Sequence, residues 1–153
     1  MTARGAFLGA LATAALAFGP TSAAAQDEQA PVRQVVIPAG ATTSPNLSPA
    51  VRARNVLYVS GQLPAPSAAA DIQSQTRSAL NSMKTVVEAG GSTMANVVKC
   101  TVFLVDVADF AGMNEAYVEF FPKDPPARST VVVAALVRAY AKIEIECIAA
   151  MPR

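Results

Sequence analysis

Apolar residues recur every three or four positions in two stretches of this 153-residue chain, a spacing that places them on one face of a helix. The first stretch follows Asp71, a residue type favoured at helix N-caps, and stops at Gly90 and Gly91, which suit the left-handed backbone of helix ends. The second follows Asp106 and stops at Pro122. The pattern predicts two amphipathic helices. Their apolar stripes are Ile72, Ala79, Leu80, Met83, Val86 and Val87 in the first and Phe110, Met113, Tyr117, Phe120 and Phe121 in the second.

The other apolar segments are short, and they predict five strands. They are rich in β-branched and aromatic residues and lie at about 34–38, 55–60, 96–105, 129–136 and 142–149. The last one alternates polar and apolar residues, so one face is buried and the other carries two carboxylates. The element order β-β-α-β-α-β-β predicts an α+β fold in which two helices back one mixed sheet.

The first 25 residues have the three parts of a secretory signal peptide. Arg4 provides the positive start, residues 6–18 form an apolar run, and three alanines at 23–25 offer a cleavage site. The alternative is a membrane anchor, but a spanning helix needs about 20 apolar residues, more than this run contains. We therefore predict a periplasmic or secreted protein, with a leader and first strand at 26–43 and one functional domain at 44–153.

Composition narrows the chemistry of that domain. Without the signal peptide, and hence without Arg4, 11 basic side chains balance 11 acidic ones, which argues against nucleic acid as a main partner. No second apolar stretch is long enough to span a bilayer. The chain has no histidine, which excludes histidine-based triads and imidazole metal sites. Cys100 and Cys147 lie in strand-like runs, where buried free cysteines are the favoured interpretation and a disulfide the alternative.

Three segments carry candidate chemistry, each with a plain structural alternative. Arg128 precedes Ser129 and Thr130 at the start of an apolar strand. Its planar guanidinium can donate two parallel hydrogen bonds to a carboxylate. The alternative is a surface arginine in an ion pair. Glu144 could position or deprotonate water, or be an ordinary exposed strand glutamate. Gly61 ends a strand, where backbone N–H groups could approach a ligand, or where the chain simply turns.

Five segments in order, covering about residues 44–150, resemble the RidA/YjgF family. The most specific part pairs PARST at 126–130 with KIEIE at 142–146. The remaining segments are VSGQLP at 59–64, VVKCTVFL at 97–104 followed by DF at 109–110, and NEAY at 114–117 with FF at 120–121.

The resemblance implies a homotrimer of chorismate-mutase-like subunits with ligand clefts at the subunit interfaces. It also implies hydrolysis of reactive 2-imino acids, the tautomers of enamines, to 2-keto acids and ammonia, without a metal or cofactor. By position, Arg128 would bind the substrate carboxylate and Glu144 would hold the attacking water. The cleft would be lined by Ser60, the Gly61 backbone, Thr130 and, in a supporting role, Asn114.

Two features depart from the family pattern. Leu47 stands thirteen residues before Ser60, where many members place a tyrosine, and an apolar residue there favours a bulkier or more apolar substrate side chain. The predicted signal peptide would separate the chain from cytoplasmic amino-acid metabolism. Two alternatives therefore stay open beside the deaminase: a non-catalytic small-carboxylate-binding protein of the cell envelope, and a holdase-like chaperone or ribonuclease. The neutral charge of the mature chain opposes the ribonuclease.

Overall fold

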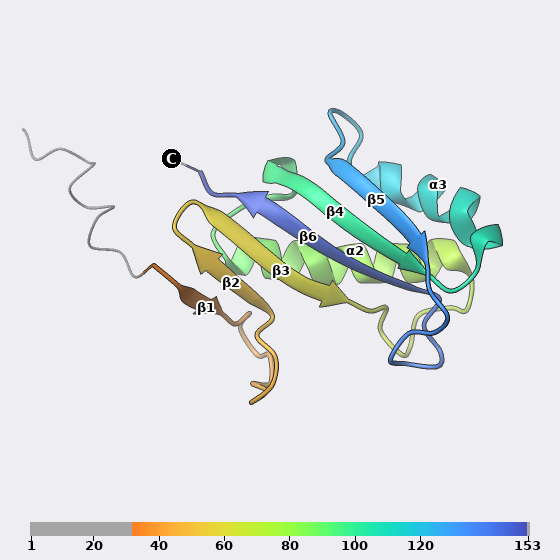
Figure 1. The fold of residues 1–153 in the computed structure, drawn as a ribbon, viewed down its shortest axis with the longest axis horizontal. Coiled ribbons are helices and arrows are strands. Elements are labelled where there is room, and N and C mark those ends of the chain that lie inside the picture. The colour runs from red at the N-terminus through yellow and green to blue at the C-terminus, as the bar shows by residue number, and fades with distance from the viewer. Residues whose placement is uncertain (1–31, 153) are drawn as a thin grey trace, which may run out of the picture. The chain divides into compact units, whose positions relative to one another are not determined.

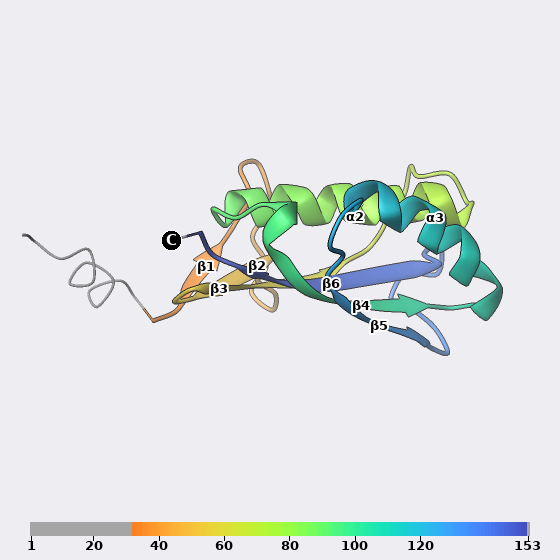
Figure 2. The ribbon, with the colours of Figure 1, turned by 90° about the horizontal axis from the view of Figure 1, so that it is seen from above.

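A computed structural model describes residues 32–152, in which six strands form one mixed sheet and two α-helices lie on one of its faces (Figure 1, Figure 2). The strand order is β1-β2-β3-β6-β4-β5, antiparallel except for the pair β4–β5. This arrangement confirms the predicted α+β fold. The elements are β1 Gln34–Val36, β2 Ala50–Ala53, β3 Val56–Gln62, α2 Ile72–Ala89, η1 Met94–Asn96, β4 Val97–Leu104, η2 Val107–Asp109, α3 Phe110–Phe120, β5 Ala127–Val132 and β6 Ile143–Ala150.

The predicted signal peptide, residues 1–25, lies outside the described residues. Of the predicted leader and first strand at 26–43, the structure describes the part from residue 32 onward, which includes β1. Across residues 32–152, no helix combines the length and the apolar character that crossing a membrane requires.

Both predicted helices are present. The Asp71 carboxylate accepts a hydrogen bond from the Ser74 backbone N–H at 2.8 Å, which confirms the predicted N-cap of α2. The Asp106 carboxylate accepts from the Ala108 N–H at 2.9 Å and so caps the short 3-10 helix η2. The α-helix proper, α3, therefore begins at Phe110, later than the position of Asp106 predicts.

The sheet contains one strand that the pattern did not predict. β2 pairs antiparallel with β3, but its four residues include an arginine and do not stand out from the preceding loop. The strand expected at 129–136 ends instead at Val132, although apolar residues follow. It ends there because its neighbour β4 ends at Leu104, the residue paired with Val132, so the chain beyond has no strand to pair with.

The two faces of the sheet differ, and this difference decides where each candidate residue points. In β6, Ile143, Ile145 and Cys147 are buried under the helices, whereas Glu144 and Glu146 project from the uncovered face. The predicted alternation is confirmed. Helix-facing residues of β3, β4 and β6 form the hydrophobic core together with the apolar stripe of α2.

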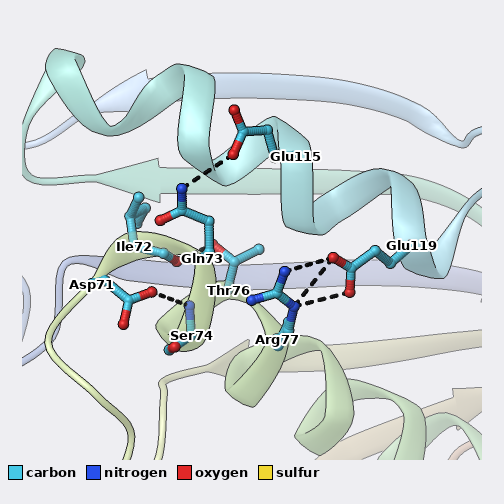
Figure 3. Close-up of polar contacts among 8 residues, drawn as sticks. All are labelled: Asp71, Ile72, Gln73, Ser74, Thr76, Arg77, Glu115 and Glu119. Carbon is cyan, nitrogen blue, oxygen red and sulfur yellow. Dashed lines mark hydrogen bonds and ion pairs between the residues drawn. The ribbon is translucent and has the colours of Figure 1, made fainter.

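Polar contacts join the outer surfaces of α2 and α3 (Figure 3). The Arg77 guanidinium donates to both carboxylate oxygens of Glu119, at 2.6 and 2.9 Å, and the Gln73 amide donates to Glu115 at 3.1 Å. The Arg77 and Glu119 side chains are each nearly half exposed, so their ion pair adds little stability. The pair joins the exposed surface of α2 to that of α3, the helix that contributes to the candidate site.

Cys100 and Cys147 form a disulfide, so the favoured interpretation of two free cysteines is wrong. The two residues face each other on the antiparallel strands β4 and β6, with their Cα atoms 4.1 Å apart. That closeness depends on strand register, which the spacing of cysteines along a chain does not reveal. Both cysteines are buried beneath the helices.

Removing the disulfide should destabilise the domain. We expect a Cys100→Ala/Cys147→Ala variant to lose about 2–4 kcal/mol of unfolding free energy, because its unfolded state is no longer cross-linked. The bridge spans a sequence separation of 47 residues, and urea unfolding measures the loss. Wild-type protein unfolded with a thiol reductant is the control, since it keeps both sulfur atoms. Equal midpoints for oxidised and reduced wild type would contradict the expectation.

Candidate functional site

Arg128 lies on the edge strand β5 with its side chain on the helix-covered side, since its partner in β4 is the buried Cys100. The guanidinium donates a hydrogen bond from Nη2 to Oδ1 of Asn114 at 2.7 Å. Its central carbon lies 4.6 Å from the ring centroid of Tyr117 and 6.0 Å from that of Phe110, distances at which aromatic rings attract a cation. Residues of α3 therefore hold the guanidinium in place.

No carboxylate among residues 32–152 forms an ion pair with Arg128, so the alternative of a surface ion pair is wrong for the described chain. One of its nitrogens is bonded to Asn114, and further donors remain for a ligand. A cavity of roughly 360 Å³ opens beside it. The guanidinium is thus arranged to receive an anion.

Thr130 shares the side of the sheet on which Arg128 lies, because its partner in β4 is the buried Val102. Ser129 points the other way, and its hydroxyl accepts a hydrogen bond from the Lys99 ammonium at 2.7 Å. Of the two hydroxyls that follow Arg128, only that of Thr130 can support the guanidinium. Ser129 lies away from the guanidinium because neighbouring strand residues face opposite sides of a sheet.

Glu144 projects from the uncovered face, and its carboxylate lies directly against the backbone of Gly61. A Cβ added at Gly61 would overlap with the carboxylate oxygen Oε1, so glycine is required for this contact. The register of β3 against β6 also shifts here, between Val59 and Gln62. Burial raises the pKa of Glu144 above the usual glutamate value, and the charge of Glu146 adds to the rise.

Ser60 is fixed by the loop that precedes β2. Its hydroxyl donates to the Ser48 carbonyl at 2.8 Å and its backbone N–H donates to the Pro49 carbonyl at 3.1 Å. The hydroxyl proton is therefore committed to the loop, while the oxygen can still accept a hydrogen bond. Leu47, in the same loop, is 59% exposed.

The site residues predicted from the sequence thus fall into two groups within one chain. Arg128, Asn114 and Thr130 lie on the helix side at the β5 edge. Gly61 contacts Glu144 on the uncovered face, and Ser60 precedes Gly61 in β3. Strands lie about 4.8 Å apart, so β6 is about 10 Å from β5, and β4 stands between them. The described residues contain no group of three or more metal-ligating side chains that could hold an ion.

Two contacts of the candidate site were not predicted, because the sequence pattern assigned Phe110 and Tyr117 to the apolar stripe alone. Both rings lie against the guanidinium of Arg128. Burial raises the pKa of Tyr117 to about 12, so its phenol is neutral at physiological pH. The sequence did contain a signal for these contacts. Asn114 is a polar residue on the same helix face as the two aromatic residues, within an otherwise apolar stripe.

The chain is similar in sequence to proteins of a known family. Residues 39–151 match the family model described as Endoribonuclease L-PSP. The chain is 41% identical over 109 residues to the chloroplastic Reactive Intermediate Deaminase A of Arabidopsis thaliana, covering 68% of this chain and 58% of that protein. It is 42% identical over 107 residues to a RutC family protein of Pyrococcus horikoshii, covering 67% and 84% of the two chains.

Solved structures show the same fold. The YjgF gene product of E. coli matches with a TM-score of 0.71 and 35% identity, over 78% of this chain and 99% of that one. A YjgF/YER057c/UK114 family protein of Mycobacterium tuberculosis matches with a TM-score of 0.70 and 28% identity over the same shares. With the family model matching residues 39–151, this chain belongs to the Endoribonuclease L-PSP family, the family of the RidA and YjgF proteins.

Proposed function

We propose that this protein hydrolyses reactive 2-imino acids, and the enamines with which they interconvert, to 2-keto acids and ammonia. The observation that carries the proposal is the Arg128 guanidinium, which has no carboxylate partner in residues 32–152 and is held by Asn114 and Tyr117 beside a cavity. A substrate carboxylate would complete its hydrogen bonds. The name Reactive Intermediate Deaminase A, carried by the Arabidopsis relative, supports the same reaction class.

The reaction requires few functional groups from the protein. The carbon of a protonated C=N bond is already electrophilic, so the site has to orient the substrate, place a water and move protons. Glu144, whose pKa is raised, would accept a proton from the attacking water as the new C–O bond forms. The nitrogen would then take up a proton and leave as ammonia while the carbonyl of the keto acid forms.

We propose further that the protein is a homotrimer in which a second copy completes the site. A small acid bound to Arg128 cannot reach Glu144 of the same chain, because the two side chains lie on opposite sides of the sheet. The face that carries Glu144 is uncovered and exposes Tyr58 and Val131, apolar surface that an interface would bury. The trimer would bring Arg128 of one copy to Glu144 and Gly61 of the next.

Mixing two impaired variants, assayed at substrate concentrations well below KM, tests this shared site. Arg128→Ala and Glu144→Gln subunits, refolded together at equal amounts, should regain roughly a quarter of wild-type activity, the fraction of interfaces that pair two intact residues in a random closed trimer. Each variant refolded alone is the control. No recovery in an assembly whose light-scattering mass is that of three chains would place both residues in one chain's site and contradict the proposal.

Direct assay tests the reaction itself. Freshly generated 2-iminopropanoate or 2-iminobutanoate, mixed with the protein, should release ammonia and the matching keto acid faster than the uncatalysed reaction. The product ratio should be one to one, because each hydrolysis consumes one C=N bond. Equal rates from wild type and Arg128→Ala would contradict the proposed function. Tight binding of keto acids through Arg128 without turnover of any imine would instead identify a non-catalytic carboxylate-binding protein.

The pH dependence should report Glu144. Since its pKa is raised by burial and by Glu146, and since the reaction needs the carboxylate form, kcat/KM should fall on acidification at a pH above the usual glutamate value. Glu146→Gln should move this acid limb to lower pH, because the neighbouring negative charge is gone. A pH profile of kcat/KM from about 4 to 9 measures the acid limb in the wild type and in Glu146→Gln. An acid limb that stays in place in Glu144→Gln would assign it to another group.

We also propose that the protein is exported and works in the periplasm or outside the cell. The signal-like sequence of residues 1–25 and the buried Cys100–Cys147 disulfide both support this location, because structural disulfides persist in oxidising compartments. Cell fractionation followed by N-terminal sequencing tests it, with mature protein expected to begin after Ala25. Uncleaved protein in the cytoplasmic fraction would contradict the proposal.

A further inference from the structure

The cavity beside Arg128 has two chemically different parts. The Arg128 guanidinium and the Asn114 amide, which are hydrogen-bonded to each other, form its polar part, and Tyr117 adds a hydroxyl. The remaining walls come from α3 and from the loop before β5, and they are apolar or aromatic. These wall residues are Tyr117, Val118, Phe121, Pro125 and Pro126.

The walls are well fixed. Tyr117 and Phe121 are both about 95% buried, with ring centroids 4.7 Å apart. The wall from the loop before β5 is formed by two consecutive prolines that follow Asp124, whose φ of 47° sets the turn of the loop. Because prolines have a fixed φ, this wall is rigid. The cavity is therefore formed before a ligand arrives.

The charge of the lining residues restricts which ligands the cavity can bind. Arg128 is the only charged side chain among the lining residues, and a carboxylate bound to it would neutralise that charge. A second charge on the ligand would lie among proline, valine and aromatic side chains without an oppositely charged partner, which is unfavourable. The volume of roughly 360 Å³ equals that of about a dozen water molecules, which leaves room for an apolar group beyond the carboxylate.

We propose that this cavity is the pocket for the substrate side chain, and that it selects 2-imino acids with branched aliphatic or aromatic side chains over small or charged ones. The inference rests on the proposed function, because the ligand is placed by its carboxylate on Arg128. Val118, at 55% exposure on α3, sets the width of the pocket at its mouth.

Binding of the product 2-keto acids tests the pocket independently of turnover, since they carry the same carboxylate and side chain. Calorimetry should show 4-methyl-2-oxopentanoate and phenylpyruvate binding roughly tenfold or more tightly than pyruvate or 2-oxoglutarate, the discrimination expected of an apolar pocket. The kcat/KM values of the corresponding imines should follow the same order.

Val118→Phe narrows the pocket and should weaken binding of the two large keto acids more than binding of pyruvate, so that the preference for large side chains is lost. The matched control is Val107→Phe, the same change at a valine that is 71% exposed on η2 and outside the cavity. This control should keep the wild-type preference.

The outcomes separate the two proposals. Turnover of imines with no preference among side chains, or a preference that Val118→Phe leaves intact, would overturn the pocket and leave the deaminase standing. A preference in keto-acid binding without any imine turnover would support the pocket and overturn the deaminase. Equal binding of all four keto acids without any imine turnover would overturn both.

Discussion

Replacing Arg128 with alanine should lower kcat/KM for 2-imino acids by roughly 100-fold or more, because two charge-assisted hydrogen bonds and the orientation that they impose are lost together. Most of the loss should appear as a higher KM, since the carboxylate is bound in the ground state as well as in the transition state. Steady-state kinetics on freshly generated imines measures both parameters.

The matched control is Arg77→Ala. Arg77 is also an arginine bonded to a residue of α3, but it lies on the outer surface and pairs with Glu119 (Figure 3). Its loss should leave kcat and KM unchanged, because exposed ion pairs contribute at most about 1 kcal/mol. A similar loss of activity in both variants would assign the Arg128 effect to a displaced α3. Arg128→Lys should remain impaired, since an ammonium keeps the charge without the planar fork.

Glu144→Gln should lower kcat by about 100-fold to 10,000-fold, the range for removal of a general base. KM should change little, because the carboxylate of the substrate is held by Arg128 and not by Glu144. Arg128→Ala should therefore change mainly KM, whereas Glu144→Gln should change mainly kcat. Glu146→Gln is the matched control, since it removes the same charge from the same face of β6 and should retain activity at neutral pH.

The thermal stability of Glu144→Gln tests whether unfolding causes that loss of activity. The pKa of Glu144 is raised in the folded protein, so the folded state binds a proton there more readily than the unfolded chain does. Ionisation of Glu144 at neutral pH therefore opposes folding, and this penalty disappears as pH falls below the raised pKa. Glutamine carries no charge, so the thermal midpoint of Glu144→Gln at pH 7 should equal or exceed that of wild type. A lower thermal midpoint would contradict the assignment of the activity loss to the missing general base.

Much of the fold followed from periodicity. The stripe from Ile72 to Val87 predicts α2 because a helix needs one apolar face to cover the sheet, and the structure confirms it. The alternation in β6 predicts a buried face and an acidic face for the same reason. β2 escaped prediction because four residues with an arginine carry too little pattern. That strand is held by its pairing with β1 and β3, which involves residues distant in sequence.

The sequence by itself determined the α+β class, both helices and the candidate residues Arg128 and Glu144, because side-chain type and local spacing are properties of the chain alone. Only the tertiary structure decided that Cys100 meets Cys147, that Arg128 stacks on Tyr117 instead of pairing with a carboxylate, and that Glu144 lies on the opposite side of the sheet. Each of these depends on strand register or on how α3 packs against β5. Register and packing are set by contacts between distant segments, which no local pattern contains.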